Sequence, residues 1–320
     1  MKFDSDIEKF NSPGGSKPGE FEMWYFDAID NDDDYYFTAR IYYGNPNNFD
    51  STENSNLENS NKYCGFRFFL YYQNRLVYNA NYDYRKEEFK TEESEGLIKM
   101  ILDKNSFCFD MENDKYFLNI NYSSAELESK FKAEFEFKPL IEKLSVNKKT
   151  DYDLENEVYW MPSPLCEVSG KIKVYRDFKR VKTIFNGKGY IDKTWGSTNS
   201  FNKISYSNWG KFIREDYSFI FHLSESKGED KFMKLFIFKD NLLLLEKEDF
   251  KILTKKTLFT QKIKSVEIES DDLKIILKNE LNIESGEFGD KYISKFDMYH
   301  DEKKVIDNVY GFFETVVNTK

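Results

Sequence analysis

The sequence predicts an all-β protein of antiparallel strands, and three observations support this prediction. Apolar residues alternate with polar residues wherever a period can be recognised, as in Phe131 to Phe137, where every odd position is apolar. Aromatic residues make up 18% of the chain, with 31 Phe, 22 Tyr and 4 Trp, and such residues favour pleated, half-buried surfaces. Helical patterns are scarce: only Ser5 to Phe10 and Pro139 to Leu144 are expected to form a turn or two of helix.

The strands are expected in short runs bounded by clusters of Asp, Asn, Gly or Lys, as is usual for antiparallel hairpins. Some runs alternate between apolar and polar residues, and the others are rich in β-branched or aromatic residues. In chain order, the expected strands are 65–72, 115–120, 131–137, 171–175, 217–223, 232–238 and 273–277. The apolar run Leu242 to Leu245 is expected to be a buried strand.

Two breaks in composition organise the chain. The polar stretch Asn45 to Lys62 has too little apolar surface to offset the entropy lost on ordering, so we expect a long mobile loop there. The stretch Lys143 to Asn156 is charged and has no period, and we place a domain boundary near residue 155. The resulting domains, 1–155 and 156–320, each have a suitable length for one closed antiparallel barrel.

Charge and composition exclude several classes of function. The net charge of −10 repels nucleic acid phosphates and anionic membrane surfaces. No apolar run approaches the about 20 residues of a membrane span, and the acidic start Met1 to Asp6 does not resemble a signal peptide, so a cytoplasmic protein is expected. The 3 cysteines form no C-x-x-C pair and are expected to be reduced core residues. With 2 histidines and no glycine-rich phosphate motif, we expect no metal and no cofactor.

Four segments together resemble one known family. Residues 22–28 read EMWYFDA and residues 187–196 read GKGYIDKTWG, and residues 208–211 (NWGK) and 309–314 (VYGFFE) follow in order. The set resembles the carotenoid 1,2-hydratase (hydroxyneurosporene synthase) family and its lipocalin-like relatives, which include fungal Diels–Alderases. The resemblance covers most of the chain. It implies two tandem lipocalin-like β-barrels, with a lipophilic substrate held in a pocket at or between them.

The chain departs from this family at one position of the longest motif. The family pattern is G-x-G-Y-x-D-H-x-W-G, whose His and Trp are thought to serve catalysis, and here the His position is Lys193 while the Trp is Trp195. An ammonium cannot replace a neutral imidazole; it would bind an anionic or carbonyl oxygen of a substrate or form an ordinary salt bridge. The hydratases also need a later Tyr and Asp, and Asp216 and Tyr217 align with them too poorly to be carried over. The departure argues against hydration as such and leaves cyclisation open.

The candidate catalytic residues all lie in this motif, and they are Tyr190, Asp192, Lys193 and Trp195. On a strand, Lys193 and Trp195 would face one way, and Tyr190 and Asp192 the other. Desolvation of Asp192 among aromatic rings would favour its protonated form, which can donate a proton to an alkene. Nearby ring faces would stabilise a carbocation by ~1–2 kcal/mol each. Alternatively, Asp192 anchors a loop by accepting backbone N–H bonds.

Four further aromatic residues are candidates for binding the substrate: Trp24, Tyr25, Trp160 and Trp209. The alternative is that the tryptophans simply fill a barrel core, where large aromatic side chains are common. His222 alternates in phase with Ser218 and Ile220, opposite Phe219 and Phe221, and is expected at the surface or at the rim of a pocket rather than as a ligand. The acidic run Asp30 to Asp34 is expected to be a solvated hairpin turn rather than a calcium loop, because it lacks the Gly and the spaced Glu of such loops.

Two classes of function fit these expectations. The first is an enzyme of specialised metabolism that cyclises a lipophilic polyene or isoprenoid, by a pericyclic reaction or by a proton trigger, or hydrates it. The second is a non-catalytic lipocalin-like carrier of the same hydrophobic small molecule. Both share a fold, and fold alone does not determine function. An ionisable group facing the ligand favours the enzyme, because a carrier needs only an apolar cup.

Overall fold

The computed structural model describes residues 2–3, 20–44, 63–94, 96–110, 112–124, 129–141, 158–176, 179–197, 203–214, 217–227, 231–257, 262–286 and 289–317. Most of these residues are in β-strands, and the only helical element among them is one 3-10 turn, Lys86–Glu88. The all-β prediction is therefore confirmed. Pro139 ends a strand rather than opening a helical turn. The segments 5–10, 45–62 and 143–156 lie outside the described residues.

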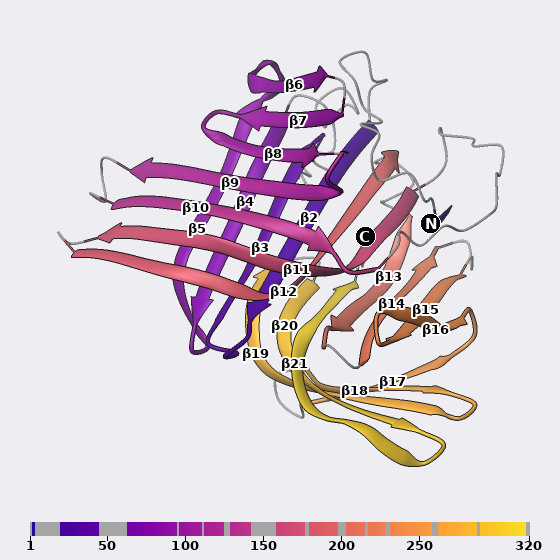
Figure 1. Cartoon of the computed structure of the whole chain (residues 1–320). Helices are drawn as coiled ribbons and strands as arrows, with labels where there is room; N and C mark the ends of the chain where they lie inside the picture. The colour runs from indigo at the N-terminus through magenta and orange to yellow at the C-terminus, as the bar shows by residue number, and fades with distance from the viewer. Residues whose placement is uncertain are drawn as a thin grey trace. The chain divides into compact units, whose positions relative to one another are not determined.

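The chain divides into two units, residues 1–201 and 202–320. The first unit contains a 12-stranded sheet with the order β5-β4-β3-β2-β12-β11-β10-β9-β8-β7-β6, and β1 pairs with β11. The sheet curls into a nearly closed barrel, in which the steep strands β2 to β5 cross behind β7 to β12 (Figure 1). Its strands are β1 (Lys2–Phe3), β2 (Glu20–Asp30), β3 (Tyr35–Tyr43), β4 (Tyr63–Tyr72), β5 (Arg75–Arg85), β6 (Phe89–Ser94), β7 (Leu97–Leu102), β8 (Asn105–Asp110), β9 (Lys115–Ser124), β10 (Ser129–Pro139), β11 (Val158–Arg176) and β12 (Lys179–Ser197).

The second unit contains a 9-stranded antiparallel sheet with the order β16-β15-β14-β13-β21-β20-β19-β18-β17. It curls into a half-barrel, drawn in colours that run from salmon-red at β13 through orange to yellow at β21 in Figure 1. Its strands are β13 (Ile204–Phe212), β14 (Tyr217–Ser226), β15 (Lys231–Lys239), β16 (Leu242–Lys247), β17 (Lys251–Lys256), β18 (Ile263–Ser270), β19 (Leu273–Gly286), β20 (Gly289–His300) and β21 (Lys303–Val317).

The boundary between the units differs from the expectation of a division at residue 155. Strands β11 and β12 follow residue 155, yet they complete the first sheet: β11 pairs with β10, and β12 pairs with β2. The domain ranges 1–155 and 156–320 are therefore corrected to the two units given above. The physical reason is that β12 closes on a strand far away in sequence, and the composition of a linker carries no information about such a pairing.

Each unit has its own hydrophobic core. The core of the first unit is largely aromatic, and in it the rings of Phe37 and Phe135 stack with centroids 4.1 Å apart. The core of the second unit combines aliphatic residues with Phe and Tyr, including Phe313 and Tyr292. The three cysteines form no disulfide, and Cys64 and Cys166 are buried while Cys108 is half-buried. The part of the chain that the structure describes has no helix with the length and hydropathy of a membrane span.

Two local expectations have opposite outcomes. The acidic run after β2 is a hairpin turn, in which Asp30 Oδ1 accepts hydrogen bonds from the backbone N–H groups of Asp34 (2.8 Å) and Tyr35 (3.0 Å). The run Leu242 to Leu245 is a strand, as expected, but it is not buried: Leu242 is 73% exposed and Leu244 is 50% exposed. β16 is the edge strand of the described sheet, so no other strand of that sheet pairs with its outer side.

Candidate functional site

Strand β12 carries the residues of the longest motif, and it lies between β2 and β11. The first two glycines of the motif allow this close packing, because a Cβ atom at Gly187 would collide with the carbonyl oxygen of Ile29, and one at Gly189 with that of Asp27. Successive side chains of a strand face opposite sides of the sheet. Lys193 and Trp195 therefore face the barrel interior, and Tyr190 and Asp192 face the other side, as the sequence predicts.

The interior side holds a group that we call the Lys193 cluster: Lys193, Glu22, Trp24 and Trp195. Lys193 Nζ lies 3.0 Å from Glu22 Oε1, and both side chains are fully buried. The same Glu22 oxygen accepts a hydrogen bond of 3.0 Å from Trp24 Nε1. Lys193 Nζ is also 5.1 Å from the ring centroid of Trp24 and 4.9 Å from that of Trp195. Lys193 was expected either to bind a substrate oxygen or to form an ordinary salt bridge, and in the structure it forms a salt bridge with Glu22.

The opposite side holds a second group, the Asp192 cluster: Asp192, Tyr190, Trp160 and Tyr25. Asp192 Oδ2 accepts hydrogen bonds from Tyr190 Oη at 2.9 Å and from Trp160 Nε1 at 3.3 Å. All four side chains are buried, and Asp192 itself is 6% exposed. The rings of Tyr25 and Tyr190 are 6.2 Å apart between centroids. Both donors are neutral groups, a phenol O–H and an indole N–H.

The structure thus divides the predicted site residues into groups. Tyr25, Trp160, Tyr190 and Asp192 come together on one side of the sheet, whereas Trp24, Lys193 and Trp195 come together on the other. Trp24 also packs on the Phe107 ring at 4.9 Å, so it is a core residue as well as a neighbour of Lys193.

Trp209 is the predicted site residue that belongs to the second unit. It lies on β13, is 8% exposed, and has Lys291 Nζ 5.7 Å from its ring centroid. In the cross-strand register, Trp209 lies between His222 of β14 and Glu314 of β21.

His222 is not at the surface, one of the two places expected for it, because it is 6% exposed. Its Nε2 lies 3.1 Å from Ser207 Oγ and 2.9 Å from Ser224 Oγ, and these two hydroxyls are 3.1 Å apart. Burial lowers the pKa of His222 to about 3, so the imidazole is neutral at pH 7. We call these three residues the His222 cluster.

Sequence reasoning missed two charged residues beside the candidate site. Glu22 is the anion of the Lys193 cluster, and a signal for it exists: it is in phase with Trp24, Phe26 and Ala28, so a charged residue occupies an inward position. Arg40 on β3 has its guanidinium 5.8 Å from the ring centroid of Tyr25. No motif pointed to Arg40, because its position depends on the pairing of β2 with β3.

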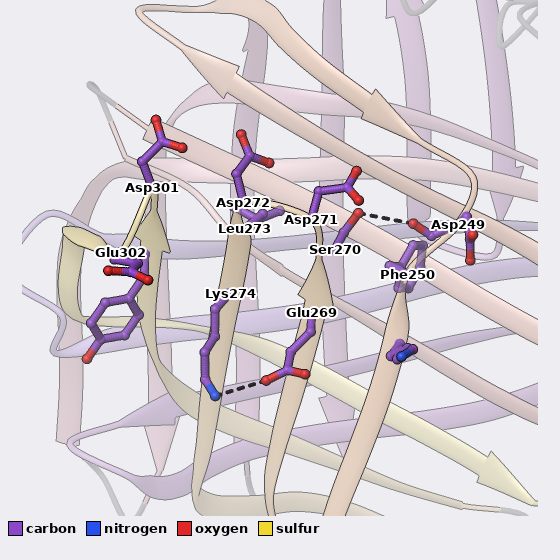
Figure 2. A pocket seen from close by; sticks show the side chains of 12 residues that line it. Asp249, Phe250, Glu269, Ser270, Asp271, Asp272, Leu273, Lys274, Asp301 and Glu302 are labelled. Atoms are coloured by element: carbon purple, nitrogen blue, oxygen red, sulfur yellow. Dashed lines mark hydrogen bonds and ion pairs between the residues drawn. The ribbon is translucent and has the colours of Figure 1, made fainter.

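A hollow of about 1010 Å³ lies elsewhere, in the second unit (Figure 2). Six carboxylates line it, with Lys251, Lys274, Tyr299 and a few less polar groups: Asp249, Glu269, Asp271, Asp272, Asp301 and Glu302. Lys274 forms an ion pair of 3.0 Å with Glu269. None of the predicted site residues lines it, and its charge does not suit a lipophilic ligand. Among the described residues, no group of three or more His, Cys, Asp or Glu side chains could hold a metal ion.

Comparisons with known proteins agree with the motif resemblance. No family model matches the chain. The chain is 25% identical over 231 residues to hydroxyneurosporene dehydrogenase from Chlorobaculum tepidum, a match that covers 66% of this chain and 58% of that relative. The match thus spans less than two thirds of the relative's length.

Solved structures share the fold. The structure of CghA has a TM-score of 0.65 at 10% identity and covers 100% of this chain and 98% of its own. CghA with Sch210972 has a TM-score of 0.64 at 9% identity, covering 94% and 89%. Kievitone hydratase from Nectria haematococca has a TM-score of 0.61 at 13% identity, covering 100% and 96%. These findings confirm the resemblance to carotenoid 1,2-hydratase and its lipocalin-like relatives, and with it the tandem lipocalin-like architecture.

Proposed function

We propose that the protein is a cofactor-independent enzyme that adds a proton to a carbon–carbon double bond of a lipophilic polyene or isoprenoid, and so cyclises or hydrates it. One observation carries the proposal: the buried Asp192 carboxyl is held by two neutral donors among aromatic rings. A carrier gains nothing from such a group, because burying an ionisable side chain costs stability. Buried carboxyls of this kind are typical of acid–base sites.

The proposed reaction begins with protonated Asp192. The Asp192 carboxyl supplies the transferred proton, and the hydrogen bonds from Tyr190 and Trp160 hold its Oδ2 in place. The proton forms a C–H bond at one alkene carbon, and the other carbon becomes a cation. The ring faces of Tyr25, Tyr190 and Trp160 stabilise that cation by ~1–2 kcal/mol each when water is excluded. Lys193 takes no part, since it is engaged with Glu22.

The cation then reacts in one of two ways. In hydration, water adds to the cation and releases a proton to the Asp192 carboxylate, which restores the acid. In cyclisation, a second double bond attacks the cation, and loss of a proton from a neighbouring carbon to Asp192 completes the reaction. Two relatives' names support parts of this proposal: hydroxyneurosporene dehydrogenase points to a carotenoid substrate, and kievitone hydratase points to hydration.

The test is turnover in heavy water with an acyclic carotenoid such as neurosporene, analysed by mass spectrometry. A proton-triggered reaction leaves at least one deuterium on carbon in the product. Asp192→Asn keeps the shape of the side chain but loses its acidity, so we expect at least a ten-fold loss of rate, or ~1.4 kcal/mol in barrier height. Asp103→Asn, at an exposed turn of the same unit, is the matched control and should leave the rate unchanged.

The other functions give different results in the same experiment. A pericyclic enzyme forms product without deuterium and is indifferent to Asp192→Asn. A carrier binds the carotenoid and returns it unchanged at stoichiometric protein. Either result would rule out acid chemistry at Asp192.

A further inference from the structure

The interior of the second unit contains a polar row that the proposed function does not use. Asn208 on β13 lies directly opposite Thr315 on β21, and Thr315 lies directly opposite Asp290 on β20. These positions alternate in phase with the core residues Phe212 and Phe313, so the row faces the interior of the half-barrel. Asn208 is 0% exposed and Thr315 is 5% exposed.

Two oxygens of this row lack a hydrogen-bond partner. Within the part of the chain that the structure describes, neither Asn208 Oδ1 nor Thr315 Oγ1 is hydrogen-bonded. Asn208 Nδ2 already donates to the Tyr206 hydroxyl. Buried polar atoms of folded proteins nearly always have a partner, so these two oxygens call for one beyond the described residues.

The third member of the row limits the charge of that group. Asp290 Oδ1 accepts a hydrogen bond of 3.0 Å from Asn282 Nδ2, and Oδ2 accepts one of 3.1 Å from Tyr292 Oη. Burial and the neighbouring carboxylate raise the pKa of Tyr292 to about 12, so this hydroxyl stays protonated and donates. A ligand anion would be repelled by Asp290, whose charge is already stabilised by two neutral donors.

The surroundings of the row indicate an apolar ligand body. The Tyr292 ring lies 6.1 Å from that of Phe313, which in turn lies 6.4 Å from that of Phe221. Tyr206 and Asp290 are only half-buried, so solvent reaches one side of the row. Asn208 and Thr315 are themselves enclosed, so a small neutral group would have to enter past Tyr206 and Asp290, with its apolar part against the rings.

We propose that Asn208 and Thr315 bind the hydroxyl group of a lipophilic alcohol in the second unit. A hydroxyl donates one hydrogen bond and accepts others, which matches this pair: it donates to Asn208 Oδ1 and accepts from the Thr315 hydroxyl. The binding site is independent of Asp192 and of the proposed reaction.

The test is calorimetric titration of the full chain with farnesol, with farnesene as the matched hydrocarbon. We expect farnesol to bind wild-type protein at least ten-fold more tightly than farnesene. Thr315→Val should lose at least ten-fold in farnesol affinity and leave farnesene binding unchanged. Its melting temperature should not fall, because the replaced hydroxyl makes no hydrogen bond to any residue that the structure describes. Thr315→Ser should restore farnesol binding, and Thr254→Val, at an exposed position of β17, should have no effect.

Other outcomes would overturn the proposal. Equal farnesol affinity in wild type and Thr315→Val, or no saturable binding, means that Asn208 and Thr315 bind water only. Tighter binding of farnesylamine than of farnesol means that Asp290 selects a cation. If Thr315→Val does not fold, the pair Thr315→Ala and Thr315→Ser makes the same comparison.

Discussion

The Lys193 cluster of the first unit and the His222 cluster of the second unit are both deeply buried, but they satisfy their polar groups in opposite ways. Lys193 is held by the opposite charge of Glu22 at 3.0 Å. His222 is held by the hydroxyls of Ser207 and Ser224, and burial lowers its pKa to about 3. The first cluster therefore depends on the presence of both partners, and the second depends on the imidazole remaining neutral. Asp192 is intermediate, because it is an ionisable group held by neutral donors.

The largest effect is expected from breaking the charged cluster. Lys193→Met leaves Glu22 buried without its cation, and we expect the free energy of unfolding to fall by ~3–5 kcal/mol. Urea denaturation followed by far-UV circular dichroism measures this loss. The control is the double variant Lys193→Met/Glu22→Gln, which removes both charges and should recover most of the stability. A single variant within about 1 kcal/mol of wild type would mean that the pair is not buried in solution.

A fall in pH should lower the free energy of unfolding through the His222 cluster. The unfolded pKa of His222 is near 6.5 and its folded pKa is about 3, so the unfolded state binds more protons between these values. The contribution of His222 to stability is present above pH 6.5 and is lost as the pH falls towards 3, by about 2 kcal/mol between pH 7 and pH 5. Glu314 opposes this shift but is the smaller influence. Stability should therefore depend on pH more steeply in wild type than in His222→Gln, and parallel curves would contradict the burial of a neutral imidazole.

The smallest effect on stability is expected at the Asp192 cluster. Tyr190→Phe removes one of the two donors to Asp192 Oδ2 and leaves Trp160 in place, so we expect a loss of about 1 kcal/mol in stability. Thermal denaturation measures it, and the proposed reaction should slow several-fold at the same time. If Tyr190→Phe lost as much stability as Lys193→Met, the burial of Asp192 would depend on its partners as strongly as the burial of Lys193 depends on Glu22.

Local patterns predicted the strands well, because alternation is a property of neighbouring residues. The runs 131–137 and 171–175, for example, lie within β10 and β11. The unit boundary could not be predicted in this way, since it depends on β12 pairing with β2 across most of the first unit. Nor could alternation reveal that Leu242 is exposed, because an edge strand and a central strand have the same local sequence character.

For the candidate site, the sequence predicted which side of the strand each side chain faces but not which residues contact it. Alternation placed Lys193 and Asp192 on opposite sides of β12, and the structure agrees. The partners themselves depend on register: Lys193 lies opposite Trp24, and Trp195 opposite Glu22. A shift of one residue would have moved Glu22 to the other side of the sheet. Only the folded pairing therefore identifies the anion beside Lys193.

The placement of the tryptophans has a spectroscopic consequence. Of the 4 tryptophans, Trp24, Trp160 and Trp195 belong to the first unit and Trp209 to the second. Intrinsic emission is therefore weighted towards the first unit, and Trp209→Phe would confine it there. Comparing the emission of that variant with that of wild type during denaturation would follow the two units separately, without any external dye.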